Sequence, residues 1–174
     1  MIPRSPNPSP SAPEPLLPER GWQVPVVGWR TWRARSSDGR VVLEGVRSGL
    51  QWDCGTTHAD CPDGKAGLHP IPAASCDCGL FAFSGADDAL HYLVTPTDTL
   101  DWDDAPLVAG AVIAWGRIVP DGLGAWRAQH ARPVALLDSD SSMLEALAFR
   151  HRVPLVSARG LRLLPLEYGE VLKG

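Results

Sequence analysis

The chain's four cysteines all lie within one short segment, and two histidines lie among them. These residues are Cys54, His58, Cys61, His69, Cys76 and Cys78. Thiolate sulfur and imidazole nitrogen are the ligands that hold zinc tetrahedrally. In a reducing compartment, clustered cysteines favour a metal over disulfides. The segment therefore indicates a zinc site.

Two ligand sets fit this spacing. Both sets contain the close pair Cys76 and Cys78. One set is the four cysteines, including Cys54, and the other is Cys61, His69, Cys76 and Cys78. The surrounding loop, residues 50–80, is rich in Gly and Pro, so a closed zinc site would supply the folding energy that the loop lacks. Such a site is structural, because a catalytic zinc keeps one position open for water. The alternative is that the cysteines are ordinary buried side chains.

Tryptophan and arginine alternate along the first long apolar segment. If this segment is a strand, its successive side chains face opposite sides, and a Trp/Arg face could stack the bases of single-stranded nucleic acid. The residues concerned are Trp29, Arg30, Trp32, Arg33 and Arg35, with Trp126 and Arg127 as an extension. The competing interpretation, which we favour, places the tryptophans in the core with arginine stems packed over them.

Apolar patterning and turn residues predict the elements that position these side chains. The expected strands cover residues 24–35, 41–46, 80–83, 107–119, 125–130, 134–137 and 153–157. One expected helix, 86–93, is capped by Ser84, and a second, 143–150, is opened by a capping box of Ser142 and Glu145. The order predicts an α+β fold: a mostly antiparallel β-sheet or barrel-like core with two short helices and a zinc-stapled loop.

Composition predicts the domain organisation. Residues 1–20 are dominated by Pro and Ser without apolar periodicity, so we expect a disordered tail. Residues 21–174 then form a single globular domain. A formal charge of -4 argues against a binder of duplex nucleic acid, which usually carries a basic surplus. No apolar run approaches the ~20 residues of a membrane span and no signal pattern opens the chain, so we expect a cytoplasmic protein without membrane contact.

The familiar catalytic motifs are missing from this sequence. It has no H-E-x-x-H, no G-x-S-x-G and no phosphate-binding glycine loop. A thiol nucleophile, Cys61 beside His58 or His69, is conceivable, but nothing in the spacing selects it over zinc ligation. We therefore name no catalytic residue, and we expect a protein that is not an enzyme.

Several short motifs follow one another between residues 28 and 128. They contain Gly28, Arg30 and Trp32; Trp52; Ala59 and Cys61; His69 and Pro72; the run from Cys76 and Cys78 through Gly79 and Leu80 to Phe81 and Ala82; Gly110, Val112, Trp115, Gly116 and Val119; and Gly124, Trp126, Arg127 and Ala128. This order resembles an uncharacterised bacterial family associated with actinobacteria, with the motifs G-x-R-x-W, H-x-x-P, C-x-C-G-[IL]-[YF]-A and W-G-x-V. The resemblance implies Cys61, His69, Cys76 and Cys78 as the ligand set and brings no known activity.

Together these features predict a small, non-enzymatic binding or adaptor module with a structural zinc ion. Its expected partner is a macromolecule, in the first place another protein. The second hypothesis is a nucleic-acid-binding module that uses the Trp/Arg strand. The third is a zinc-dependent hydrolase or transferase with an open zinc site. The sequence leaves the identity of the partner, the pathway and the oligomeric state open.

Overall fold

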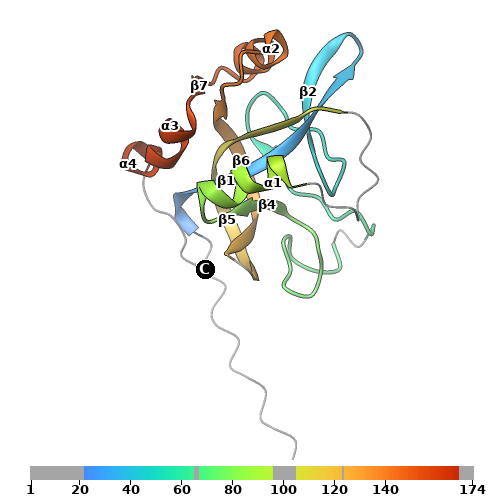
Figure 1. Cartoon of the computed structure of the whole chain (residues 1–174). Helices are drawn as coiled ribbons and strands as arrows, with labels where there is room; N and C mark the ends of the chain where they lie inside the picture. The colour runs from blue at the N-terminus through green and yellow to red at the C-terminus, as the bar shows by residue number, and fades with distance from the viewer. Residues whose placement is uncertain (1–21, 65–66, 96–104, 123, 169–174) are drawn as a thin grey trace, which may run out of the picture.

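The computed structural model describes residues 22–64, 67–95, 105–122 and 124–168, and a seven-stranded sheet forms its centre (Figure 1). The strands are β1 (Trp22–Ser37), β2 (Arg40–Gly45), β3 (Thr57–His58), β4 (Leu80–Phe83), β5 (Leu107–Gly122), β6 (Ala125–Leu137) and β7 (Leu155–Val156). All strand pairs are antiparallel except β6 with β7, which is parallel. The predicted α+β fold with a mostly antiparallel sheet is confirmed. The predicted tail, residues 1–20, lies outside the described residues.

Four of the strands close into a near-ring. β1 pairs with β5, β5 with β6, β6 with β4, and β4 with β1. The last of these links is a single residue pair, Trp29 with Phe83. Beyond it β1 and β4 separate, so the ring has one weakly joined side. The expected barrel-like core is therefore a ring that is almost, but not fully, closed.

Turn residues set the two long hairpins. Asp38 and Gly39 connect β1 to β2 with φ angles of 51° and 71°, and two positive φ angles in a row suit the twist of a two-residue hairpin loop. The second hairpin joins β5 to β6. Its return strand was expected as two segments, but β6 is continuous through Pro133, where a register shift against β5 accommodates a residue that cannot donate a ladder hydrogen bond.

Short helices cover the sheet: α1 (Ala86–Val94), α2 (Ser142–His151), α3 (Ala158–Leu163) and α4 (Pro165–Tyr168). Both predicted helices are present as α1 and α2, and α3 and α4 are additional, because they are too short to show a helical period in the sequence. The N-cap of α3 is Ser157, whose side chain accepts a hydrogen bond from the Gly160 amide. The strand expected over 153–157 is reduced to the two residues of β7.

Both predicted helix caps were also wrong. The N-cap of α1 is Gly85 rather than Ser84, and the N-cap of α2 is Ser141. Neither cap makes a side-chain hydrogen bond. Ser142 already belongs to the helix, so it cannot be the non-helical residue that a capping box requires. The Ser84 amide instead donates to the Gly124 carbonyl, which ties the start of α1 to the β5–β6 turn.

The core consists of two large apolar clusters on the two sides of the sheet. One includes Trp32, Trp126 and Leu147 of α2, and the other includes Trp29 and Leu161 of α3. Glycine makes this packing close: a Cβ at Gly28 would strike the Trp126 ring. Among the helices of the described ranges, none is long and apolar enough to cross a membrane.

Candidate metal centre

One of the two predicted ligand sets comes together in the structure. The ligand atoms of Cys61, His69, Cys76 and Cys78 all lie within 4.8 Å of one another. Cys61 Sγ lies 3.5 Å from His69 Nε2 and 3.7 Å from Cys76 Sγ. A tetrahedral ion bound at about 2.0–2.3 Å holds its ligands about 3.5–3.8 Å apart. These two distances fit tetrahedral coordination, and the four residues together could hold a metal ion.

The strand β6 brings the two ends of the ligand segment together. β3, three residues before Cys61, pairs with Ala131 and His130 of β6. β4, which follows Cys78, pairs with β6 from Ala125 to Ala128. The stretch between them, residues 59–79 and called here the metal loop, is thus anchored at both ends on one strand. β3 could not be predicted from the sequence, because two residues are too few to show an alternating pattern.

Backbone and imidazole hydrogen bonds orient the ligands. The Ala73 amide donates to Cys78 Sγ at 3.4 Å, which fixes the position of this ligand atom. His69 Nδ1 lies 2.9 Å from the Pro70 carbonyl oxygen. A donor bond there fixes the ring with Nε2 toward the cysteines, the arrangement usual for a metal-binding histidine.

Arg127 holds the metal loop against β6. Its Nη1 donates to three backbone carbonyls of the loop, those of Ala73, Cys76 and Cys78. Its Nε donates to Asp121 at 2.6 Å, so the buried cation has a counter-ion. Three carbonyls on one guanidinium nitrogen fix the loop's path between its ligands. From the sequence, the role expected for Arg127 was a nucleic-acid contact. No local pattern could have shown that it holds the loop, since the three carbonyls that it binds lie about 50 residues away.

Gly79 is required where the metal loop enters β4. Its φ of 118° lies in a region that residues with a Cβ rarely adopt. A Cβ here would also lie 2.8 Å from the Pro72 Cβ and 2.9 Å from the Arg127 Cβ. The glycine of the C-x-C-G motif therefore lets the chain turn directly after the last ligand.

Cys54 and His58 do not join the cluster. Cys54 is exposed, so the four-cysteine set is not assembled. His58 Nδ1 instead lies 2.9 Å from His130 Nδ1. Burial, and secondly the neighbouring His58, lower the pKa of His130. The other predicted nucleophile pair, Cys61 with His69, belongs to the metal group itself.

The tryptophans of the predicted Trp/Arg face lie in the core. Trp29, Trp32 and Trp126 are each at most 3% exposed, so their rings present no surface on which a base could stack. Trp29 Nε1 donates to the Leu161 carbonyl at 2.9 Å. The remaining predicted contacts are Arg30 and Arg127, which are buried, and Arg33 and Arg35, which are half-buried, with Arg35 paired to Glu44 at 2.8 Å. The competing interpretation, tryptophans in the core, is confirmed.

The fold and the site together define a class: a small α+β protein with a near-ring of strands and a Cys₃His group that can hold a metal ion. No protein-family model, curated protein or solved structure matches this chain. The family resemblance therefore stays an expectation that depends on the motifs alone.

Proposed function

We propose that this chain is a non-enzymatic binding module, stabilised by a structural zinc ion, that recognises another protein. The observation that carries the proposal is the closed Cys₃His group, whose four ligand atoms all lie within 4.8 Å of one another. Four protein ligands complete a tetrahedron, whereas a catalytic zinc keeps one position for water or substrate.

The donor set selects the metal. Thiolate ligands are soft and favour zinc over calcium or magnesium, which prefer oxygen. Cys61 and Cys78 are also buried, which suits an ion that holds a fold rather than one that meets a substrate. Among its described residues, the metal loop around them has one small apolar cluster of its own, Cys61, Ala73 and Cys78. Binding energy from zinc would supply what this cluster cannot.

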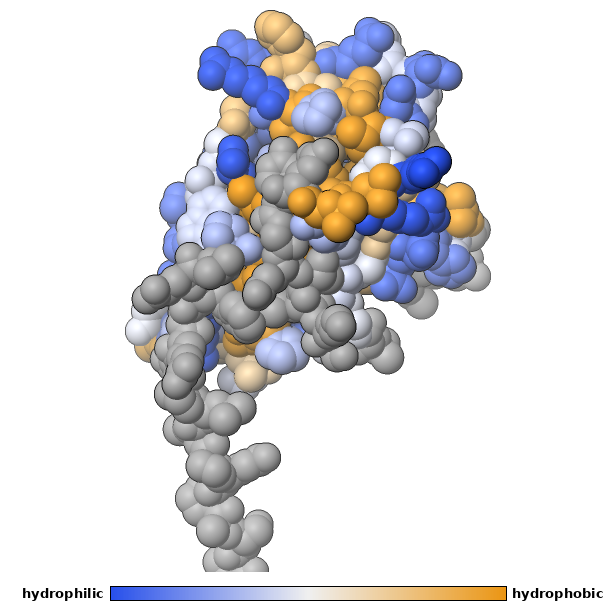
Figure 2. Space-filling model, turned by 90° about the vertical axis from the view of Figure 1, so that its left-hand side faces the viewer, coloured by the Kyte–Doolittle hydropathy of each residue, from blue (hydrophilic) through white to orange (hydrophobic). Residues whose placement is uncertain are grey.

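The side of the molecule that carries α2 and α4 supports the proposal of a protein partner. Phe149 of α2 is 87% exposed and Leu166 of α4 is 85% exposed. Figure 2 faces this side of the molecule and shows apolar surface gathered on it. Large apolar side chains that face water are enriched where proteins meet one another, since their burial stabilises the complex.

Metal content of the purified protein tests the zinc site. We expect one zinc ion per chain by mass spectrometry in protein prepared without added metal. Cys61→Ser and Cys76→Ser should lose the zinc, because each removes a ligand. Cys54→Ser is the matched control and should keep it, since Cys54 is exposed and outside the group. Folded wild-type protein that contains no metal would contradict the proposal.

A photo-crosslinking residue in place of Phe149 tests the partner. In cells that express the protein, we expect one defined protein to be crosslinked from this position. The same label in place of Arg40, which is exposed on the β1–β2 hairpin, is the control. Purified partner should then bind the wild type more tightly than Phe149→Ser. Equal crosslinking from both positions, or equal binding by both proteins, would count against a specific partner on this face.

A further inference from the structure

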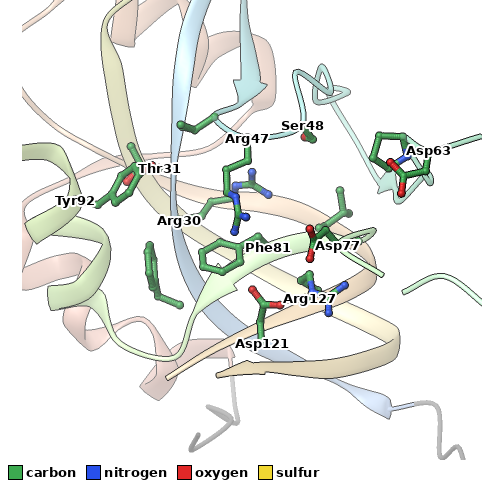
Figure 3. A pocket seen from close by; sticks show the side chains of 15 residues that line it. Arg30, Thr31, Arg47, Ser48, Asp63, Asp77, Phe81, Tyr92, Asp121 and Arg127 are labelled. Carbon is green, nitrogen blue, oxygen red and sulfur yellow. Dashed lines mark hydrogen bonds and ion pairs between the residues drawn. The ribbon is translucent and has the colours of Figure 1, made fainter. Parts of the chain in front are cut away.

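A cavity of about 480 Å³ lies beside the metal loop (Figure 3). Arg30 of β1 and Phe81 of β4 line it, next to the Trp29–Phe83 pair, beyond which these two strands are no longer paired. Pro62 and Asp77 of the metal loop form another wall. Pockets for small molecules commonly measure about 300–1,000 Å³. This cavity is therefore large enough for such a ligand.

Arg30 lines this cavity as a buried cation, and no residue in the described part of the chain forms an ion pair with it. It is only 6% exposed, and its Nε and Nη1 have no hydrogen-bond partner within the described residues. Buried charges are normally paired, because the cost of desolvation is otherwise uncompensated. Burial lowers the pKa of Arg30 to about 9, so the side chain is still charged at neutral pH. Among the described residues, this buried charge has no hydrogen-bonded counter-ion at Nε or Nη1.

Two tryptophans hold the Arg30 guanidinium in place. Its Cζ lies 4.4 Å from the centre of the Trp52 ring and 5.3 Å from that of the Trp32 ring. A cation–π contact of this kind uses the flat face of a guanidinium, whereas the N–H groups point outward from its edge. A rigid, planar fork of donors is the arrangement that carboxylates and phosphates bind. The tryptophans therefore prepare Arg30 for an anionic oxygen group.

A second arginine and two aromatic rings extend the site. Arg47, in the loop after β2, is exposed and directs its guanidinium toward the pocket, as Arg30 does (Figure 3). Phe81 of β4 and Tyr92 of α1 line the same space and offer apolar surface for a flat group. Asp77 reaches the pocket from the metal loop, where it could accept a hydrogen bond from the ligand.

From this arrangement we infer that the cavity binds a small molecule that carries an anionic oxygen group, a carboxylate or a phosphate, on a flat apolar body. The anionic group pairs with Arg30 and Arg47, and the flat body lies against Phe81 and Tyr92. The metal loop supplies one wall of the pocket, so the inference depends on the proposed zinc site only for the shape of that wall.

Binding of model compounds to the zinc-loaded full chain tests the inference. The probes are phenyl phosphate and benzoate, which separate the two anionic groups, and benzamide, which keeps the ring without the charge. By calorimetry we expect one of the two anions to bind the wild type at least tenfold more tightly than benzamide. Arg30→Met and Arg47→Gln should each weaken that binding at least tenfold. Arg40→Gln, an exposed arginine outside this pocket, should leave it unchanged.

A stability measurement separates a binding role from a structural one. Methionine fills similar space without a charge, so Arg30→Met should melt at the same temperature as the wild type or higher if Arg30 serves the ligand. A lower melting temperature with unchanged ligand binding would overturn the inference. If Arg30→Met does not fold, Arg47→Gln decides, since its side chain is exposed. Unchanged zinc content in these variants assigns any loss of binding to the pocket and leaves the zinc proposal intact.

Discussion

Single residues decide whether the metal loop can close, and Gly79 is the clearest case. Alanine at this position must adopt a φ of 118° and place its Cβ 2.8 Å from that of Pro72. We expect Gly79→Ala to lower the free energy of unfolding by about 2–4 kcal/mol, as overpacking combined with backbone strain does. Gly64→Ala is the control within the same loop, since its φ is 66° and its added Cβ would touch nothing. It should cost only about 1–2 kcal/mol. If denaturant unfolding shows equal losses of unfolding free energy for Gly79→Ala and Gly64→Ala, this account is contradicted.

Arg127 positions the candidate metal ligands without being one of them. Arg127→Leu leaves three loop carbonyls and Asp121 without their donor. Breaking a buried pair of this kind costs about 3–5 kcal/mol. We therefore expect lower stability in urea together with faster zinc loss to a chelator. Arg159→Leu, exposed on α3, should change neither quantity. Zinc release at the wild-type rate from a folded Arg127→Leu protein would rule out the role given to Arg127.

At the scale of an element, α2 contains a pH-dependent contribution to stability. Burial, and secondly the neighbouring Arg150, lower the pKa of His151 near the end of this helix. Below the usual histidine pKa of about 6.5, the unfolded chain therefore binds a proton that the folded chain does not. This contribution to stability is present above pH 6.5 and is lost as the pH falls toward the lowered pKa.

His151→Gln tests this contribution, because glutamine does not titrate. We expect the free energy of unfolding of the wild type to fall relative to that of the variant as the pH drops below about 6.5. Urea unfolding of both proteins across pH 5–8 measures this difference. Both proteins keep the same metal ligands, so protonation of the cysteines cancels in the difference. His91→Gln, an exposed position on α1, controls for the loss of a histidine. A difference that is independent of pH would show that His151 does not contribute in this way.

At the scale of the whole molecule, the sheet and the metal loop have separate sources of stability. The two large apolar clusters lie on the sheet and under the helices, whereas Cys61, Ala73 and Cys78 form a small third cluster. Removal of the metal with a chelator should therefore expose the amides of Ala73 and Cys76 to hydrogen exchange, while those of Ala111 and Ala135 stay protected. Chelator already saturated with zinc is the control. Loss of protection at all four positions together would mean that metal and sheet form one cooperative unit.

The sequence by itself determined the features that depend on local chemistry. Alternating apolar residues and turn dipeptides define β1, β2, β4 and β5 because strand pairing needs only a buried face and a loop of the right type. The cysteines and His69 carry their ligand chemistry wherever the chain places them. A metal site was therefore expected without knowledge of the fold, and Cys61, His69, Cys76 and Cys78 form a group that could hold an ion.

Only the tertiary structure decided which side chains meet. Cys61 reaches Cys76 and Cys78, and Cys54 does not, because β3 and β4 both pair with β6, and β3 was too short to detect. The arginines show the same limit. Arg127 and Arg30 look alike in the sequence. Arg127 donates to three carbonyls and an aspartate, whereas Nε and Nη1 of Arg30, beside an open cavity, have no hydrogen-bond partner among the described residues. The partner of a buried charge depends on which distant segments pack around it, and no local pattern carries that information.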